Sequence, residues 1–318
     1  DGTIVLSNVA TNQDSFHARY GGIVPEIASR RHTALLSAAI EDALDRARVA
    51  PDALDGIAVT AGPGLIGSLV VGVAAAKALA FASRRPLYAV NHLHGHIFAA
   101  FLGFNGRDGA APRYPFLTLL VSGGHSQLVA VESATAMRVL GRTHDDAAGE
   151  AYDKTARLLG IPYPGGPQLD RLAQRGNPRA YAFPRHRPGA DSLDLSFSGL
   201  KTSVRYFLES EAGRDAPPED VAASFQAAVV DVLMARLQAA FERGGYEAVV
   251  LSGGVAANSA LQNALRRWAE GNGVTAFVPA PKYCTDNAAM IAAAAFYQRD
   301  AARADPLTLS ADPNLAFS

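Results

Sequence analysis

Hydrophobic and polar positions along the first hundred residues predict strands and helices in alternation. Residues 4–9 and 87–90 have the pattern of short strands, and residues 57–61 that of a buried strand. Residues 24–49 carry apolar positions at helical spacing and predict a long helix. Strands alternating with helices favour an α/β fold.

The most apolar stretch, residues 64–82, predicts a further helix. It consists largely of Gly and Ala and contains Lys77, whose charge would cost ~3 kcal/mol at a bilayer centre. We therefore expect a buried helix of a folded domain and no membrane association. The chain starts at Asp1 without a basic-then-apolar leader, so we expect no signal peptide.

Glycine turns organise the second half of the pattern. Residues 116–121 and 127–131 are predicted strands of a hairpin around Ser122-Gly123-Gly124, after a predicted linker over 105–115. The phrase returns at Ser252-Gly253-Gly254, which follows a predicted strand and precedes a helix beginning at Asn258. The repeated Ser-Gly-Gly motif either arose by chance or indicates that two glycine turns face one ligand.

Composition restricts the classes of function. The 318 residues include 29 basic and 30 acidic side chains, so binding to nucleic acid requires a local basic patch. With 49% hydrophobic and 19% charged residues, the chain is neither disordered nor collagen-like, and its length suggests about two domains. The single cysteine, Cys284, excludes an internal disulfide and favours a reducing, cytosolic compartment.

A histidine pair is the first candidate for chemistry. His92 and His96 follow Asn91, a predicted N-cap, and the i, i+4 spacing on a helix allows two imidazoles to bind one metal ion. Two ordinary surface or core histidines would show the same spacing. His94 falls on another face, and Leu93 occupies the place where a zinc protease needs its general-base Glu, which argues against that class.

Three glycine-rich segments are candidates for phosphate or ribose binding, because glycine lets backbone amides approach an anion. For any one of them alone, a tight turn is the better explanation. None has the P-loop or the dinucleotide-binding pattern. The segments are Ser122-Gly123-Gly124-His125, Pro164-Gly165-Gly166-Pro167 and Ser252-Gly253-Gly254.

Charged segments give weaker signals with two interpretations each. Glu150, Asp153 and Lys154 lie on a predicted helix, either as solvated charge or for ribose recognition. Thr285 or Asp286 is the default N-cap of the apolar helix predicted over 288–297. Four short basic clusters are either solvated faces or contacts for a phosphate backbone: Arg30-Arg31-His32, Arg84-Arg85, Arg185-His186-Arg187 and Arg266-Arg267.

Taken together, seven sequence motifs are specific enough to indicate a family. They read V-N-H-L-H-G-H at 90–96, L-V-S-G-G-H at 120–125, D-D-A-A-G-E-A-Y-D-K at 145–154, Y-P-G-G-P at 163–167, S-F-S-G-L-K-T at 196–202, S-G-G-V-A-A-N at 252–258 and C-T-D-N at 284–287. In this order and spacing, nearly the whole chain resembles the bacterial tRNA threonylcarbamoyladenosine transferases, once labelled glycoproteases.

The resemblance implies the two-lobed, actin-like α/β fold of sugar kinases, with a nucleotide-type ligand in a cleft between the lobes. We expect residues 1–113 to form a first α/β lobe that carries the histidine pair. Residues 114–288 would form a second lobe with the glycine-rich loops, and residues 289–318 a C-terminal helix and tail returning to the first lobe.

The resemblance also assigns residues. One divalent ion, iron or zinc, is expected on His92, His96 and Asp286. The adenylate ligand is expected on ten residues of the second lobe; no catalytic side chain is assigned. The ten are Leu120, Val121, Ser122, Gly123 and Gly124 through their backbone, the adjoining His125, Asp153 and Asp170 at the ribose, and Gly166 and Asn258.

The implied activity is transfer of a threonylcarbamoyl group from threonylcarbamoyl-AMP to the exocyclic amine of the adenosine 3′ of the anticodon, in tRNAs reading codons that start with A. The implied partners are tRNA, a non-catalytic paralogous subunit and a small ATPase, with magnesium and ATP in the same system. Two alternatives are a small-molecule kinase of the acetate or sugar type and a non-catalytic scaffold subunit.

One departure from the family stands at the front. Its members begin with a strand and a phosphate loop of the type I-E-T-S-C-D-E-T, which residues 1–20 do not resemble. We expect a chain that lacks this loop to bind the adenylate poorly.

Overall fold

The computed structural model describes residues 2–11, 13, 16, 19–103, 111–186, 189 and 191–317. The chain divides into two compact units. The first comprises Asp1–Ala111, Ala134–Ala136 and Pro279–Ser318, and the second Pro112–Ser133 and Met137–Val278. The return to the first unit thus begins at Pro279, before the expected residue 289, and residues 105–110 of the predicted linker lie outside the described residues.

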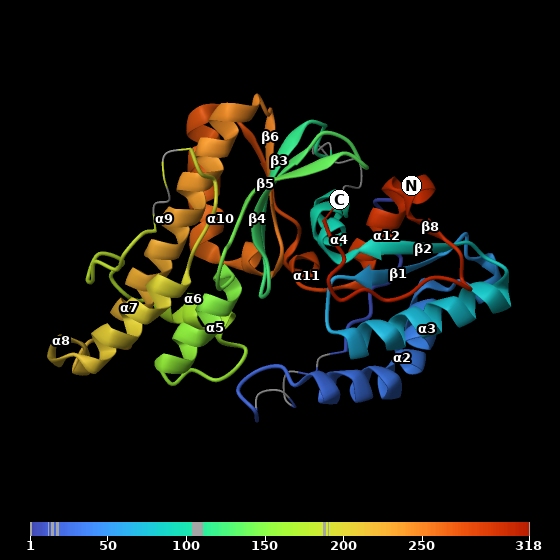
Figure 1. Cartoon of the computed structure of the whole chain (residues 1–318), viewed down its shortest axis with the longest axis horizontal. Helices are drawn as coiled ribbons and strands as arrows, with labels where there is room; N and C mark the ends of the chain where they lie inside the picture. Colours follow the sequence, from blue (N-terminus) through green and yellow to red (C-terminus); the bar gives the residue numbers. More distant parts are fainter. Residues whose placement is uncertain are drawn as a thin grey trace. The chain divides into compact units, whose positions relative to one another are not determined.

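A small sheet organises the first unit. Its order is β1 (Ile57–Gly62), β2 (Leu87–Asn91), β8 (Arg303–Ala304), with β1 and β2 parallel and β8 antiparallel to β2. Helix α3 (Ile66–Ser83) packs against β1, and α2 (Pro25–Ala47) packs against α3 (Figure 1). The predicted helix 24–49 and strands 57–61 and 87–90 are confirmed.

The remaining helices among the described residues of the first unit are short. They are η1 (Pro51–Ala53), α4 (His92–Phe98), η2 (Ala99–Phe101), α11 (Pro281–Cys284), α12 (Ala288–Tyr297) and α13 (Arg299–Ala302). Helix α12, predicted over 288–297, is confirmed and packs closely on α4. The apolar helix α12 therefore supports α4 and the side chains on it.

The prediction that the apolar helix is buried is wrong for most of its surface. In α3 only a stripe at helical spacing is buried, at Leu69, Val73, Ala76 and Ala80, while Phe81 is 72% exposed. Composition could not reveal this, because a helix of Gly, Ala and Val is equally apolar on every face. Among the described helices, α3 alone has the length and hydropathy of a membrane span.

The predicted strand over residues 4–9 is wrong. The described residues of this segment form no strand, and Ile4 and Leu6 are 59% and 66% exposed. A run of β-branched and apolar residues becomes a strand only where an edge is available for pairing, which a local pattern does not encode.

The second unit is built on a five-stranded mixed sheet. Its order is β5 (Met137–Arg142), β4 (Ser126–Val131), β3 (Phe116–Val121), β6 (Ala248–Ser252), β7 (Thr275–Phe277). Strand β4 is antiparallel to both of its neighbours, β5 and β3, and β3, β6 and β7 are parallel. Every residue of β3, β4 and β6 is buried, which explains their predominantly apolar sequence.

Six α-helices and one short 3₁₀ helix complete the described second unit. The long α9 packs against β3, β4, α6 and α10, and α5 packs against α6. The predicted hairpin at Ser122-Gly123-Gly124 and the helix capped by Asn258 are confirmed. The helices are α5 (Ala148–Leu158), α6 (Gly165–Ala173), α7 (Ser198–Glu209), α8 (Glu211–Arg214), α9 (Pro218–Gly244), η3 (Gly254–Ala257) and α10 (Ser259–Asn272).

Candidate functional site

Helix α4 carries the histidine pair and starts directly at the end of β2. Its predicted N-cap is confirmed, since Asn91 Oδ1 accepts a hydrogen bond from the Leu93 amide at 2.9 Å. Asn91 Nδ2 also donates to the carbonyl of Ala316 at 2.9 Å, so the C-terminal tail holds the same cap. These two bonds fix where the helix begins.

The aspartate lies on the short connection between α11 and α12. The default expectation that Thr285 or Asp286 caps α12 is wrong, because Asn287 Oδ1 accepts from the Met290 amide at 2.9 Å. Three consecutive residues with good capping side chains cannot be ranked by propensity alone. Asp286 lies one residue before this cap, and its side chain is 80% exposed.

The structure brings the three predicted metal ligands together within the first unit. Asp286 Oδ1 lies 3.5 Å from His92 Nε2 and 3.3 Å from His96 Nε2. The two imidazole centroids are 4.7 Å apart, with the rings at 75°. One ligand atom from each residue falls within 4.8 Å of the others.

The donor set fits a metal ion. The His96 side chain is 1% exposed, and neither of its ring nitrogens has a hydrogen-bond partner among the described residues. A buried polar atom without a partner needs an explanation, and a bound ion is one that suits a pair of imidazoles beside a carboxylate. Two imidazoles and one carboxylate with open positions suit a divalent transition metal that also contacts substrate.

The two glycine turns lie side by side in the second unit. Strands β3 and β6 are parallel, and Leu120 pairs with Ser252, so both turns follow at the same edge of the sheet. Gly253 has φ +89°, and a Cβ there would lie 2.3 Å from the Val121 carbonyl oxygen. Ligands in α/β sheets bind beyond the carboxyl ends of the strands, which is where these turns lie.

The first turn has an open backbone. The Ser122 amide donates to the His125 carbonyl at 2.7 Å, and Ser122 Oγ accepts from the His125 amide at 3.1 Å. Gly123 and Gly124 are exposed, and a Cβ at either would meet nothing within 4 Å. This backbone is accessible to a ligand.

Gly149 explains why glycine occurs within D-D-A-A-G-E. Its amide donates to the Ser122 carbonyl at 3.2 Å, and a Cβ would lie 2.6 Å from that oxygen. The first turn therefore rests on the start of α5.

Asp153 and Gly166 meet at the start of α6. Asp153 Oδ1 accepts from the amides of Gly165 at 2.9 Å and Gly166 at 3.0 Å, so the carboxylate serves as a remote cap of this helix. Burial raises the pKa of Asp153, and these two hydrogen bonds oppose the rise. The interpretation of Pro164–Pro167 as a tight turn is wrong, because Gly165 opens a helix.

Asp170 and Asn258 belong to one buried polar network. Asp170 Oδ1 accepts from Gln226 Nε2 at 3.0 Å, from Asn258 Nδ2 at 3.2 Å and from Ser259 Oγ at 2.8 Å. Asn258 Nδ2 lies 2.7 Å from Gln226 Oε1 and 3.3 Å from the Tyr152 hydroxyl. Burial, and then the Asp170 carboxylate, raise the pKa of Tyr152.

Comparison with known proteins decides the family. A family described as tRNA N6-adenosine threonylcarbamoyltransferase matches residues 4–293. The chain belongs to this family. It is 49% identical to the protein of that name from Moorella thermoacetica, with 100% of this chain and 92% of the relative covered, and 49% identical to that from Anaeromyxobacter sp., with 98% and 93% covered.

Solved structures confirm the expected two-lobed actin-like fold class. Full-length HypF in a phosphate- and nucleotide-bound form superposes with a TM-score of 0.59 over 84% of this chain and 41% of that one. HypF of T. kodakarensis superposes with a TM-score of 0.58 over 79% and 41%. At 14% and 16% identity, these likenesses show the fold alone.

Two family phrases are joined by residues that sequence reasoning did not assign. Asp145 accepts from Ser196 Oγ at 2.5 Å, Ser198 Oγ at 2.7 Å and the Phe197 amide at 2.8 Å, at the start of α7. Burial tends to raise the pKa of Asp145, but these hydrogen bonds together hold it below its usual value. The carboxylate in D-D-A-A and the serines in S-F-S-G were the available signal.

A neighbouring ion-pair cluster also joins these phrases. Asp146 lies 2.9 Å from Lys154 Nζ and 3.0 Å from Lys201 Nζ, and Lys154 also pairs with Glu150 at 2.7 Å. The predicted helix bearing Glu150, Asp153 and Lys154 is confirmed as α5. Its charges thus connect α5 to α7.

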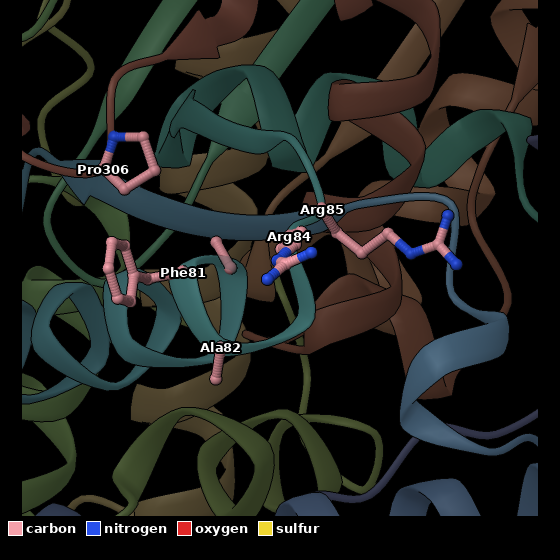
Figure 2. A pocket seen from close by; sticks show the side chains of 6 residues that line it. Phe81, Ala82, Arg84, Arg85 and Pro306 are labelled. Atoms are coloured by element: carbon pink, nitrogen blue, oxygen red, sulfur yellow. The ribbon is translucent and has the colours of Figure 1, made fainter.

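A separate hollow lies at the C-terminal end of α3 (Figure 2). Phe81 and Pro306 flank one side, while the Arg85 side chain extends away from them. The Arg85 guanidinium donates to the Asp52 carbonyl, so part of its charge is already engaged. None of the predicted metal or adenylate residues lines this hollow.

Proposed function

We propose that this chain transfers a threonylcarbamoyl group from threonylcarbamoyl-AMP to the exocyclic amine of the adenosine 3′ of the anticodon, in tRNAs reading codons that start with A. The observation that carries the proposal is the family match over residues 4–293, with 49% identity over the full chain to a named relative. As a member of this family, the chain is a tRNA-modifying transferase.

The reaction is an acyl transfer. The amine nitrogen forms a bond to the carbamoyl carbonyl carbon, the bond from that carbon to the phosphate oxygen breaks, and AMP leaves with the electron pair while the amine loses a proton. Because the mixed anhydride is already activated, the protein chiefly has to orient two substrates and stabilise developing negative charge. We assign no side chain as the base.

We propose a division of roles between the units. The second unit holds the adenylate on Leu120–Gly124, His125, Asp153, Gly166, Asp170 and Asn258; the exposed backbone at Gly123 and Gly124 supports this assignment. Backbone amides of a glycine turn can donate to phosphate oxygens without an intervening side chain. The partnered state of Asp170 means that a ribose hydroxyl must exchange with an existing hydrogen bond.

The first unit holds the metal in this proposal. The three ligand atoms within 4.8 Å of one another and the unpartnered nitrogens of His96, among the described residues, support it. A bound iron or zinc ion would supply a Lewis acid and a template for the substrate carbonyl. His92, His96 and Asp286 would hold the ion and orient its open coordination positions.

We further propose tRNA, a non-catalytic paralogous subunit and a small ATPase that uses magnesium and ATP as partners, in the cytoplasm. The exposed apolar face of α3, with Val70 50% and Phe81 72% exposed, supports a protein partner on the first unit. The thiol of Cys284, which is free and buried, agrees with a reducing compartment.

Complementation tests the function. Cells depleted of their own transferase would receive the complete reading frame that contains this chain, and nucleosides of their bulk tRNA would be measured by mass spectrometry. We expect wild type to restore threonylcarbamoyladenosine and His96→Ala to fail. Restoration by His96→Ala as well would show that the reaction does not need the proposed metal ligand. Failure of wild type to restore the nucleoside would indicate a scaffold role, and ATP-dependent phosphorylation of a metabolite without tRNA modification would indicate a kinase.

A further inference from the structure

His94 lies between the two predicted ligands but on the opposite face of α4. At 3.6 residues per turn, successive side chains are 100° apart, so His94 points about 180° away from the mean direction of His92 and His96. The sequence gives this third histidine no role. The structure surrounds it with specific contacts.

The first contact is with Gln298, which ends α12. Gln298 Nε2 lies 3.0 Å from His94 Nδ1 and 2.6 Å from the carbonyl oxygen of Ala134. Because the Ala134 carbonyl accepts only from a donor, it fixes the amide nitrogen on that side, and the second amide hydrogen then points to His94 Nδ1. His94 and Gln298 are each 7% exposed.

The second contact is with the C-terminal tail. The ring of Phe317 meets that of His94 edge-on, with centroids 4.8 Å apart and planes at 81°. The neighbouring Ala316 carbonyl accepts from Asn91, the N-cap of α4. The face of α4 opposite the metal ligands is therefore held at several points.

This support matters because α4 is short. A helix of seven residues has little stability of its own, so its rotation depends on tertiary contacts. A rotation of about 10° moves a ring nitrogen roughly 6 Å from the axis by about 1 Å. Metal-to-ligand distances tolerate only about 0.2 Å, so such a rotation would impair a site.

Gln298 also reaches a distant part of the chain. Ala134 lies in the tip of the β4–β5 hairpin, and residues Ala134–Ala136 belong to the first unit although both strands belong to the second. Strand β4 begins directly after the Ser122–His125 turn. The β4–β5 hairpin therefore runs from the glycine turn to Ala134, whose carbonyl accepts from Gln298, the partner of His94.

We propose that His94 and Gln298 are positioning residues of the metal centre. Their buried hydrogen bonds set the rotation of α4, and with it the direction in which His92 and His96 present their ring nitrogens, and they fasten the hairpin tip to that helix. This inference rests on the proposed metal site, and its experiment separates failure of one from failure of the other.

Cobalt(II) is the probe, because its visible absorption reports coordination geometry. Its affinity and spectrum would be measured by competition with a chelator in wild type, Gln298→Met and His94→Leu. We expect each variant to bind cobalt about tenfold more weakly, with a shifted spectrum, and the double variant to be little worse than either, since both break one unit.

The matched control is Gln262→Met. Gln262 Nε2 also donates to a backbone carbonyl, that of Ala256 at 2.7 Å, but in the second unit. Its loss should leave cobalt affinity and spectrum unchanged. If wild type binds no cobalt, or binds it equally well without His96, the metal site is wrong. If folded Gln298→Met and His94→Leu keep the affinity and spectrum of wild type, only the positioning role is wrong.

A measurement on wild type covers the case in which a variant does not fold. If metal ligands and hairpin tip are coupled through His94 and Gln298, metal binding must also order the tip, because coupling is reciprocal. Hydrogen exchange of the amides around residues 133–137 should slow several-fold when Zn²⁺ is added. Exchange there that is unaffected by Zn²⁺, while α4 itself is protected, would contradict the proposal.

Discussion

The proposed metal site of the first unit (His92, His96 and Asp286) and the Asp170–Asn258 network of the second are both built from family motifs. They differ in how well their polar atoms are hydrogen-bonded. Both ring nitrogens of His96 are buried without a hydrogen-bond partner among the described residues. Asp170 and Asn258 instead bond to each other, to Gln226 and to the first turn of α10. The first arrangement leaves ring nitrogens available to the proposed metal ion, whereas the polar atoms of the second are already hydrogen-bonded within the fold.

This difference has an energetic consequence. Removing an unpartnered buried polar group costs the metal-free fold little, since its desolvation is already uncompensated. Removing one member of a satisfied buried network leaves the others without partners, at about 1–3 kcal/mol each. Substitutions in the proposed metal site should therefore reduce ligand binding without reducing stability, whereas substitutions in the Asp170–Asn258 network should reduce stability.

The largest expected effect is loss of the metal in His96→Leu. We expect metal affinity to fall by more than about a hundredfold, while the metal-free protein unfolds with an unchanged or slightly larger free energy, because an apolar side chain replaces two unsatisfied nitrogens. Elemental analysis and urea unfolding of metal-free protein measure the two quantities.

His144→Ala is the control for this substitution, since His144 is 63% exposed and pairs with Asp194 in the second unit. It should keep the metal. Full metal content in both His92→Ala and Asp286→Ala would refute the assigned ligands.

The second expected effect is on stability. Asp170→Asn replaces one acceptor oxygen with an amide donor that faces the donors of Gln226, Asn258 and Ser259, and we expect the free energy of unfolding to fall by about 2–3 kcal/mol. AMP affinity, measured by calorimetry, should fall with it. The control is Asp42→Asn, whose pair with Arg46 is on the surface and should contribute less than about 0.5 kcal/mol.

An Asp170→Asn protein with wild-type stability but without AMP binding would reverse the comparison. It would mean that the network is as available to a ligand as the metal cluster.

Prediction from sequence succeeded where one local interaction decides the outcome. The Asn91 cap, the helical spacing of His92 and His96 and the hairpin at Ser122-Gly123-Gly124 depend on neighbours in the chain. The convergence of Asp286 on the histidines followed only from resemblance, because nothing local indicates a contact across 190 residues of sequence. Gln298 and Asp145 gave no local signal, since their partners lie far along the chain.

A third, smaller effect probes Asp145, a satisfied carboxylate at the surface. Asp145→Asn should cost about 1 kcal/mol at pH 7, as for the loss of other helix caps. Since hydrogen bonds hold its pKa below 3.8 in the folded chain, its stabilisation is present above that pH and is lost as the pH falls below it. The wild-type chain should therefore lose its advantage over the variant in acid.

Unfolding by urea at pH 7 and pH 3 tests this sign. An Asp145→Asn protein whose deficit is equal at both pH values would show that the carboxylate's charge contributes nothing to the start of α7.

The smallest effect on stability belongs to the open glycine turn, which by this logic should behave like the metal cluster. A Cβ at Gly124 meets nothing within 4 Å, so Gly124→Ala should change the free energy of unfolding by less than about 0.5 kcal/mol. AMP affinity should still fall several-fold, because a methyl group hinders the approach of the backbone to phosphate. Gly271→Ala, on α10 and equally uncrowded, should leave AMP affinity unchanged. Equal AMP affinity in both variants would place the phosphate elsewhere than at this turn.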